Sequence, residues 1–376
     1  MALRLTRRGL GVAVAAAVLG LTVALAPAAE AAKAPKFAKP GPYAAGVTTL
    51  ALPDREVEVW YPAKKKAARG ASPASFDLVE KAPPAIVALL PPGSRAAYET
   101  DAYRDIPAAR TTRGFPLVLM AHSTAGYREQ LSYLATHLAS WGFVVASPDI
   151  LERGLAALLG SPPANPVDDL ATMRATEALL RSENDRAGGP LANRIMPDQL
   201  AITGQSAGGS TALRFGAEPG LVTAIPLSAS GYDPQTGGLI TFPDVPTMFV
   251  TGAQDTVVPL ANVEAGFEAA NPPTRLVVVQ GAGLASVAGL CPIGGSGGLV
   301  GLAEASSLPV PESLERLASD GCPDPALDPD PAWAPIDHAV TAQLRWAFGL
   351  DRKPKGLNQK TMDRFAPVVV DYRARR

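Results

Sequence analysis

One stretch of the sequence, residues 200–210, constrains the fold of the chain more than any other. It consists of LAITGQSAGGS, a short apolar run that enters a Gly-x-Ser-x-Gly pattern and continues into small residues that suit a helix. A serine in such a strand-to-helix turn takes a strained backbone conformation, which small neighbours at Gly204 and Gly208 permit. The turn presents the Ser206 hydroxyl at a helix N-terminus, where developing negative charge is stabilised. Ser206 is therefore a candidate nucleophile, and a Gly/Ser-rich turn without chemistry is the alternative.

The segments around this turn alternate between expected strands and expected helices. Mostly apolar runs of the kind found in buried parallel strands occupy residues 115–121, 143–146, 200–203, 221–227, 247–251 and 275–280. Helical patterns cover residues 128–140, 166–181 and 339–348. We expect an α/β fold in which helices flank both faces of a mostly parallel central sheet, with ligands near the carboxyl ends of the strands.

The expected domain spans residues 47–350 and opens with alternating runs that predict antiparallel edge strands. Residues 62–113 are expected to form short helices beside these strands, and a Gly/Pro/Ser-rich excursion covers residues 281–335. The Ala/Lys/Pro-rich residues 32–46 are expected to form a flexible mature N-terminus. Residues 351–376 form a basic tail that could add a short edge strand.

The N-terminal residues 1–31 have the features of an export signal. Three arginines precede the uncharged residues 9–26, and Ala29 and Ala31 offer the small side chains that a signal peptidase requires. An adjacent arginine pair leaves twin-arginine and general export both open. We expect a protein secreted to the extracellular space or the cell envelope, with no stable membrane span after cleavage. An uncleaved anchor on a membrane-tethered scaffold is the alternative.

Charge and cysteine content exclude several classes of function. The formal net charge of −1 provides no basic face for nucleic acid, and no Gly-rich phosphate loop with its lysine is present. The two cysteines, Cys291 and Cys322, are expected to form a disulfide in an exported chain. Two cysteines alone cannot make a structural zinc site, so we expect no metal.

A carboxylate that could support Ser206 follows the predicted strand 247–251. Asp255 lies three residues after Gly252, where it can accept a hydrogen bond from an imidazole and stabilise the imidazolium. Asp233, in the loop after the preceding strand, is the reserve candidate. A turn or helix-cap role is the alternative for both.

Two backbone amides are expected to stabilise an oxyanion. One belongs to Ala207, directly after the nucleophile, and the other to Thr124, in the loop after the predicted strand 115–121. His122 begins this loop and is expected to order the turn rather than to act as a base.

Three segments together resemble a known family. Residues 120–130 (MAHSTAGYREQ), 140–146 (SWGFVVA) and 204–209 (GQSAGG) are similar in sequence and order to the secreted dienelactone-hydrolase-like branch of the α/β hydrolases. That branch neighbours bacterial platelet-activating-factor acetylhydrolase-like proteins and the cutinase/polyester-hydrolase lipases. The resemblance implies the α/β-hydrolase fold and hydrolysis of carboxylic esters by a serine nucleophile, without a metal or cofactor.

The chain departs from this family at the position of the catalytic base. The family has Gly-x-x-His after the strand that corresponds to residues 276–280, whereas this chain has Gly281-Ala282-Gly283-Leu284. A leucine cannot accept the serine proton, and loss of one triad member leaves only about 10³–10⁴-fold catalysis over water. A base from elsewhere in the chain is therefore required for efficient hydrolysis.

The chain contains three histidines, and one of them obeys the order Ser, acid, His. His137 is expected on the helix 128–140, so His338 is the remaining candidate base, with a surface or helix-start histidine as its alternative. The first hypothesis is a secreted serine hydrolase that acts on a lipid or small carboxylic ester. The second is a catalytically impaired pseudo-hydrolase that binds a lipid or ester-like ligand.

Overall fold

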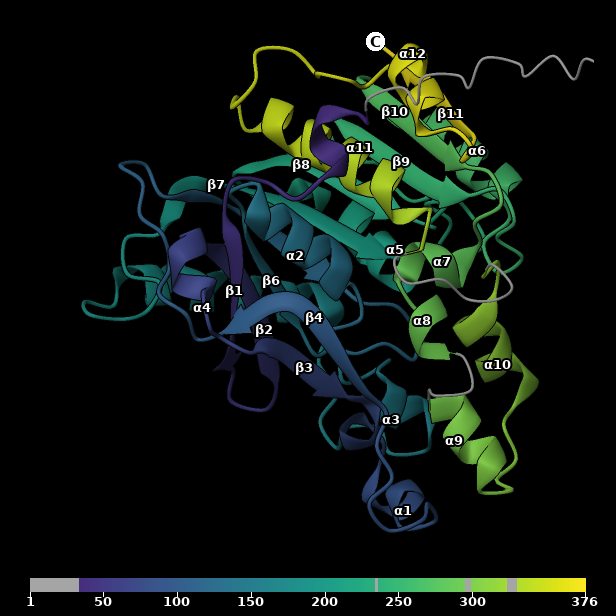
Figure 1. Ribbon diagram of the computed structural model, residues 1–376. Helices are drawn as coiled ribbons and strands as arrows, with labels where there is room; N and C mark the ends of the chain where they lie inside the picture. Colours follow the sequence, from purple (N-terminus) through teal and green to yellow (C-terminus); the bar gives the residue numbers. More distant parts are fainter. Residues whose placement is uncertain (1–33, 234–235, 295–298, 323–329) are drawn as a thin grey trace, which may run out of the picture. The chain divides into compact units, whose positions relative to one another are not determined.

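A computed structural model describes residues 34–233, 236–294, 299–322 and 330–376 of the chain (Figure 1). The expected signal peptide, residues 1–31, lies outside the described residues. Residues 295–298 and 323–329 of the excursion also lie outside them. No helix within the described ranges is long and apolar enough to cross a membrane.

Eleven strands of the described chain form one sheet, in the order β11-β10-β9-β8-β7-β5-β6-β2-β1-β4-β3. The strands are β1 (Ala44–Ala51), β2 (Glu56–Ala63), β3 (Pro73–Asp77), β4 (Ala97–Arg104), β5 (Phe115–Ala121), β6 (Val144–Pro148), β7 (Ile195–Gln205), β8 (Leu221–Leu227), β9 (Thr247–Gly252), β10 (Thr274–Val279) and β11 (Val370–Arg375). All neighbouring pairs from β6 to β10 run parallel. Antiparallel β2 and β11 flank this parallel region, so the predicted mostly parallel sheet is confirmed.

Helices cover both faces of the sheet. The helices of the described chain are α1 (Pro84–Val87), α2 (Ser132–Ser140), α3 (Leu155–Leu158), α4 (Asp169–Asp185), α5 (Ala207–Arg214), α6 (Leu260–Ala269), α7 (Leu284–Ala288), α8 (Cys291–Gly294), α9 (Leu299–Ala305), α10 (Glu312–Ser319), α11 (Trp333–Ala347) and α12 (Gln359–Met362). Figure 1 shows α2 and α11 lying across one face.

Alternating residues of the central strands separate two cores. On β5, Val118 and Met120 pack on the face that α2 and α11 cover. Leu117 and Leu119 point to the opposite face, which α4 and α5 cover. Because both faces are buried, the strand has no polar position, which explains its unbroken apolar sequence.

The region between β2 and β5 differs from its prediction. Residues 62–113 contain the short helix α1, as expected, but also the strands β3 and β4, which extend the sheet beyond β1. Most side chains of β4 are exposed or half-buried. Its sequence AYETDAYR is accordingly polar, and it lacks the apolar pattern from which a buried strand is predicted.

Both ends of the described chain pack on the domain. The 3₁₀ helix η1 (Lys36–Ala38) lies in the segment expected to be flexible, yet the Phe37 side chain is fully buried. Its ring centroid lies 4.9 Å from that of Trp141 and 5.6 Å from that of His338. In the C-terminal segment, β11 pairs antiparallel with β10 along its whole length. One aromatic anchor therefore holds the N-terminal segment, and backbone hydrogen bonds hold the C-terminal one.

Replacement of this anchor tests its contribution to stability. Phe37→Ala is expected to lower the free energy of unfolding by about 3–5 kcal/mol, because the change leaves a cavity beside α11. Urea unfolding of the mature chain measures this loss. Lys39→Ala, at an exposed position directly after the same 3₁₀ helix, is the control and is expected to change stability by less than about 0.5 kcal/mol. Equal stability of the two variants would contradict the anchor.

Candidate active site

The turn at Ser206 has the strained geometry that its sequence predicts. Ser206 lies between β7 and α5 with φ 55° and ψ −118°, a conformation rarely adopted by residues other than glycine. A Cβ atom at Gly204 would lie 2.3 Å from the Gly208 carbonyl oxygen. A Cβ atom at Gly208 would lie 2.1 Å from the Ala121 carbonyl oxygen. Glycine is therefore required at both positions, and the Ser206 side chain is partly exposed at the turn.

Asp255 lies at the same edge of the sheet as Ser206. Gln205, the last residue of β7, pairs with Leu227 at the end of β8, and Leu227 pairs in turn with Val250 of β9. The loop that follows β9 carries Asp255. Since the three strands are parallel neighbours, their carboxyl ends bring the turn and the acid loop to one edge.

The carboxylate of Asp255 is held on one oxygen only. Oδ1 accepts hydrogen bonds from the backbone N–H groups of Val257, at 3.0 Å, and Val258, at 2.6 Å. Oδ2 is buried and has no hydrogen-bond partner among the described residues. One carboxylate oxygen is thus left for a donor that the described chain does not supply.

Burial raises the pKa of Asp255 to about 6. The hydrogen bonds from Val258 and Val257 lower this pKa, and the charge of Asp320 raises it further. The Ser228 hydroxyl, at the end of β8, also lowers the pKa, although Ser228 Oγ does not reach hydrogen-bond geometry with the carboxylate. Asp255 is consequently ionised only above about pH 6.

Position 284 adjoins the end of the nucleophile strand. Leu284 is the first residue of α7 and its side chain is buried. The Gln205 Nε2 group donates to the Leu284 carbonyl oxygen at 3.5 Å, while Gln205 Oε1 is buried without a partner among the described residues. The structure thus places the apolar Leu284, which stands at the expected position of the base, next to the end of β7.

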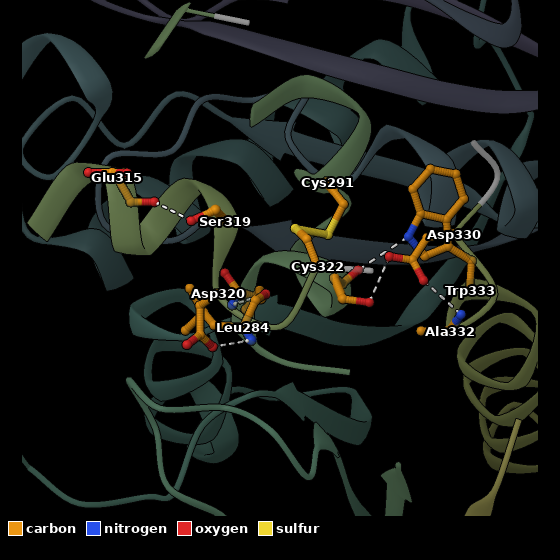
Figure 2. Close-up of a disulfide and its surroundings, with 11 residues drawn as sticks. Leu284, Cys291, Glu315, Ser319, Asp320, Cys322, Asp330, Ala332 and Trp333 are labelled. Carbon is orange, nitrogen blue, oxygen red and sulfur yellow. Dashed lines mark hydrogen bonds between the residues drawn. A yellow bond between two sulfur atoms is a disulfide. The ribbon is translucent and has the colours of Figure 1, made fainter. Parts of the chain in front are cut away.

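Asp320, at the end of α10, connects two loops of this site, and Figure 2 shows its hydrogen bond with Leu284. Its Oδ2 accepts from the Leu284 N–H at 2.9 Å, and its carboxylate also accepts from the backbone N–H and the hydroxyl of Thr256. Thr256 directly follows Asp255. One carboxylate therefore links the acid loop to the start of α7.

The predicted disulfide between Cys291 and Cys322 is present in the structure (Figure 2). It joins α8 to the residues just after α10, two positions beyond Asp320. A Cβ atom at Gly321 would lie 2.1 Å from the Gly283 amide nitrogen, so the two backbones meet directly here. The disulfide and this contact hold the excursion against the loop that precedes α7.

His338 is buried on α11, in contact with η1. The Phe37 N–H donates to its Nδ1 at 3.2 Å, and its Nε2 lies 3.3 Å from the Gly356 carbonyl oxygen, to which it can donate. Burial lowers the pKa of His338 to about 4. Because both ring nitrogens are engaged, the hypothesis of a substitute base at position 338 has no free nitrogen to support it.

The other two histidines are also buried. His122 Nε2 accepts from the Ile150 N–H at 2.8 Å, and Nδ1 lies 2.8 Å from the Ser123 carbonyl oxygen, so this ring orders the loop after β5. His137 Nδ1 lies 3.3 Å from a carboxylate oxygen of Asp337, between α2 and α11. Burial lowers the pKa of both rings to about 4. All three histidines of the chain are therefore neutral at pH 7.

The two expected oxyanion donors lie on adjacent elements. Thr124 is exposed in the loop after β5, and Ala207 begins α5. Strands β5 and β7 pair in register up to Ala121 and Gly204, which places the two loops that follow them side by side. The Gln130 side chain secures the β5 loop by accepting from the Ser123 N–H at 3.1 Å.

An apolar cavity of about 270 Å³ lies beside this constellation. Thr124 and Leu284 are among the residues that line it, whereas Ser206 is not. The cavity therefore adjoins the expected oxyanion loop and Leu284, and Ser206 does not line it.

Comparison with protein families identifies one match. Residues 101–287 match the model of the dienelactone hydrolase family. This range begins within β4, ends within α7, and includes Ser206, Asp255 and position 284. No curated protein sequence matches the chain.

The raised pKa of Asp255 has a measurable consequence for stability. Its folded-state pKa lies above the ordinary aspartate value, so the folded state binds the proton more tightly and loses stability as pH rises from about 4 to 6. Asp255→Asn removes the buried charge and is expected to stabilise the fold by roughly 1–3 kcal/mol at pH 8 but not at pH 4. Urea unfolding at both pH values measures the difference.

The control for this comparison is Asp101→Asn, at an exposed position of β4. It is expected to leave stability unchanged at both pH values. Equal stability of Asp255→Asn and the unaltered protein at pH 8 would show that Asp255 carries no uncompensated charge.

Proposed function

Because residues 101–287 match the dienelactone hydrolase family and the sheet and helices form an α/β-hydrolase fold, we propose that the chain cleaves carboxylic esters through an acyl-enzyme on Ser206. The observation that carries the proposal is the turn at Ser206, with its φ of 55° at the carboxyl end of β7. Strain of this kind persists where the surrounding structure enforces it, and it is common at catalytic nucleophiles. Asp255, at the same edge of the sheet, is the proposed acid.

The proposed reaction has two steps. Ser206 Oγ attacks the ester carbonyl carbon while the amides of Thr124 and Ala207 donate to the developing oxyanion. The bond to the alcohol oxygen then breaks, and the alcohol leaves with a proton equivalent to the one that Ser206 loses. Water attacks the acyl-enzyme in the second step, which releases the acid and returns the proton to Ser206.

The first step lacks an imidazole to carry the proton. At neutral pH Asp255 is ionised, since its pKa is about 6, and with water it is the acceptor that the site offers. An enzyme of this kind is expected to turn over about 10⁴–10⁶-fold more slowly than one with an intact triad. We therefore propose a slow hydrolase whose site is organised for attack but not for proton transfer.

A second function, binding of a lipid or ester-like ligand without turnover, is favoured by one observation. Leu284 occupies the position of the family's base, and the three histidines are buried in other contacts. A chain of this kind keeps the cleft and the oxyanion donors but does not complete the reaction.

Substitution at positions 206 and 284 distinguishes the two functions. Leu284→His is expected to raise hydrolysis of short p-nitrophenyl esters by about 10²–10⁴-fold, the usual contribution of a general base. Leu284→Asn, which is polar but has no basic nitrogen, is the matched control and is expected to give no rise. Ser206→Ala is expected to abolish both turnover and labelling by a fluorophosphonate probe.

Two outcomes would contradict the ester hydrolase. Labelling that persists in Ser206→Ala would show that another residue is the nucleophile. An unaltered protein that neither labels nor turns over, together with an inactive but folded Leu284→His, would favour ligand binding without turnover.

We also propose that the protein is exported and that residues 1–31 are removed. The arginine-led apolar N-terminus carries this proposal, and the Cys291–Cys322 disulfide is compatible with an oxidising compartment. Mass spectrometry of the chain recovered from culture medium is expected to give a mature N-terminus near Ala32. A chain that retains residues 1–31 in the membrane fraction would contradict export and favour an anchored protein.

A further inference from the structure

The apolar cavity beside the site is formed largely by elements outside the central sheet. Its walls come from α1, α3, α7, α8, α9 and α10, together with the loop after β5. The excursion after β10 supplies the last four of these helices. The cavity is therefore a product of the segment that Asp320 and the disulfide hold in place.

The chemistry of the walls restricts what the cavity can hold. No charged side chain is among its lining residues in the described part of the chain. Of the polar ones, Ser123 and Gln130 hydrogen-bond to each other at 3.0–3.1 Å, so they offer little to a ligand. The buried Tyr127 hydroxyl has no partner among the described residues and is one polar point in the wall. Leucine, isoleucine, valine, proline and alanine side chains form most of the remaining surface. This surface favours a ligand that is uncharged and apolar along most of its buried length.

The two ends of the cavity differ in character. One end lies at Thr124 and Leu284, beside the expected position of the ester carbonyl. The cavity also reaches Leu89, two residues after the end of α1, whose side chain is 57% exposed. A chain that enters past Leu89 can therefore be buried while its polar end remains near the loop after β5.

We propose that this cavity binds a single unbranched alkyl chain, the acyl part of the ester on which Ser206 acts. The inference rests on the proposed function for the identity of the polar end, and on the cavity for the chain. A volume of about 270 Å³ lies just below the usual range for ligand pockets of roughly 300–1,000 Å³. This volume, together with lining residues that run from Thr124 and Leu284 to Leu89, suits one medium-length alkyl chain.

Binding of 2-alkanones tests the cavity without requiring chemistry at Ser206. These ketones carry the carbonyl and the chain of the ester but cannot be hydrolysed. Between 2-heptanone and 2-undecanone, affinity is expected to rise roughly fourfold with each added methylene, as for burial of apolar surface. Isothermal titration with the mature protein and with Ser206→Ala is expected to give the same series for both.

Ala303 and Ala305 of α9 provide a matched pair of variants. Ala303 lines the cavity, whereas Ala305 is exposed and does not. Ala303→Phe is expected to weaken binding of 2-undecanone at least tenfold by filling the cavity, and Ala305→Phe to leave it unchanged. In the Leu284→His variant, ester kinetics are expected to favour decanoyl over acetyl esters, and Ala303→Phe in that background to remove the preference.

Several outcomes would overturn the cavity as the chain site. The first is an affinity that does not depend on ketone length. The second is equal affinity of Ala303→Phe and Ala305→Phe for 2-undecanone, and the third is tighter binding of 2-acetonaphthone than of 2-undecanone. The ester hydrolase can fail separately: length-dependent ketone binding by a protein without turnover supports the alkyl site and contradicts the hydrolase. Turnover without ketone binding supports the hydrolase and overturns the alkyl site.

Discussion

Direct contact between backbones at the Ser206 turn is the constraint on which the site depends. The close approaches at Gly204 and Gly208 bring β7, α5 and the end of β5 together with no side chain between them. The same contact sets the strained conformation of Ser206, the start of α5 and the course of the loop that carries Thr124. A Cβ atom at either glycine would separate these elements by more than a hydrogen bond tolerates.

Around this turn the protein retains polar groups that lack partners. Three polar atoms near this turn are buried without hydrogen-bond partners among the described residues. They are Gln205 Oε1 at the end of β7, Ser228 Oγ directly after β8, and Asp255 Oδ2 in the loop after β9. Such groups cost stability, and proteins tolerate them mainly where function requires them. An imidazole at position 284 is what the resemblance to the family leads one to expect, and Leu284 supplies no hydrogen-bond donor from its side chain.

The excursion after β10 has a structural part in both proposals. Asp320 of the excursion hydrogen-bonds to the loop after β9 and to the start of α7. The Cys291–Cys322 disulfide joins α8 to the residues that follow α10. Hydrogen bonds from Ser286 of α7 to Asp330, at 2.8 Å, and from Trp333 of α11 to the Ser286 carbonyl oxygen, at 3.2 Å, secure the other side of α7. The helices that wall the cavity are therefore fixed to the same loops as the acid.

The sequence by itself determined the α/β class, the strained turn at Ser206 and the central strands, because each depends on local pattern. Buried parallel strands are continuously apolar, and a tight turn needs small residues at fixed positions. Strand β4 was missed because most of its side chains are exposed or half-buried and its sequence is polar. Strand β3, at the edge of the sheet, is only five residues long and begins with a proline. The partners of Ser206 were predicted from chain order, which locates the acid loop but says nothing about neighbours across the fold.

Only the tertiary structure decided the environment of His338, which chain order favours as a base. Its two ring nitrogens meet the backbone of Phe37, 301 residues away, and of Gly356. Likewise, the link from Asp320 to Thr256 spans 64 residues, and no spacing in the sequence announces it. Contacts of this kind arise from the packing of whole elements. They decide whether an imidazole nitrogen is free to accept a proton, and the neighbouring residues in the sequence do not.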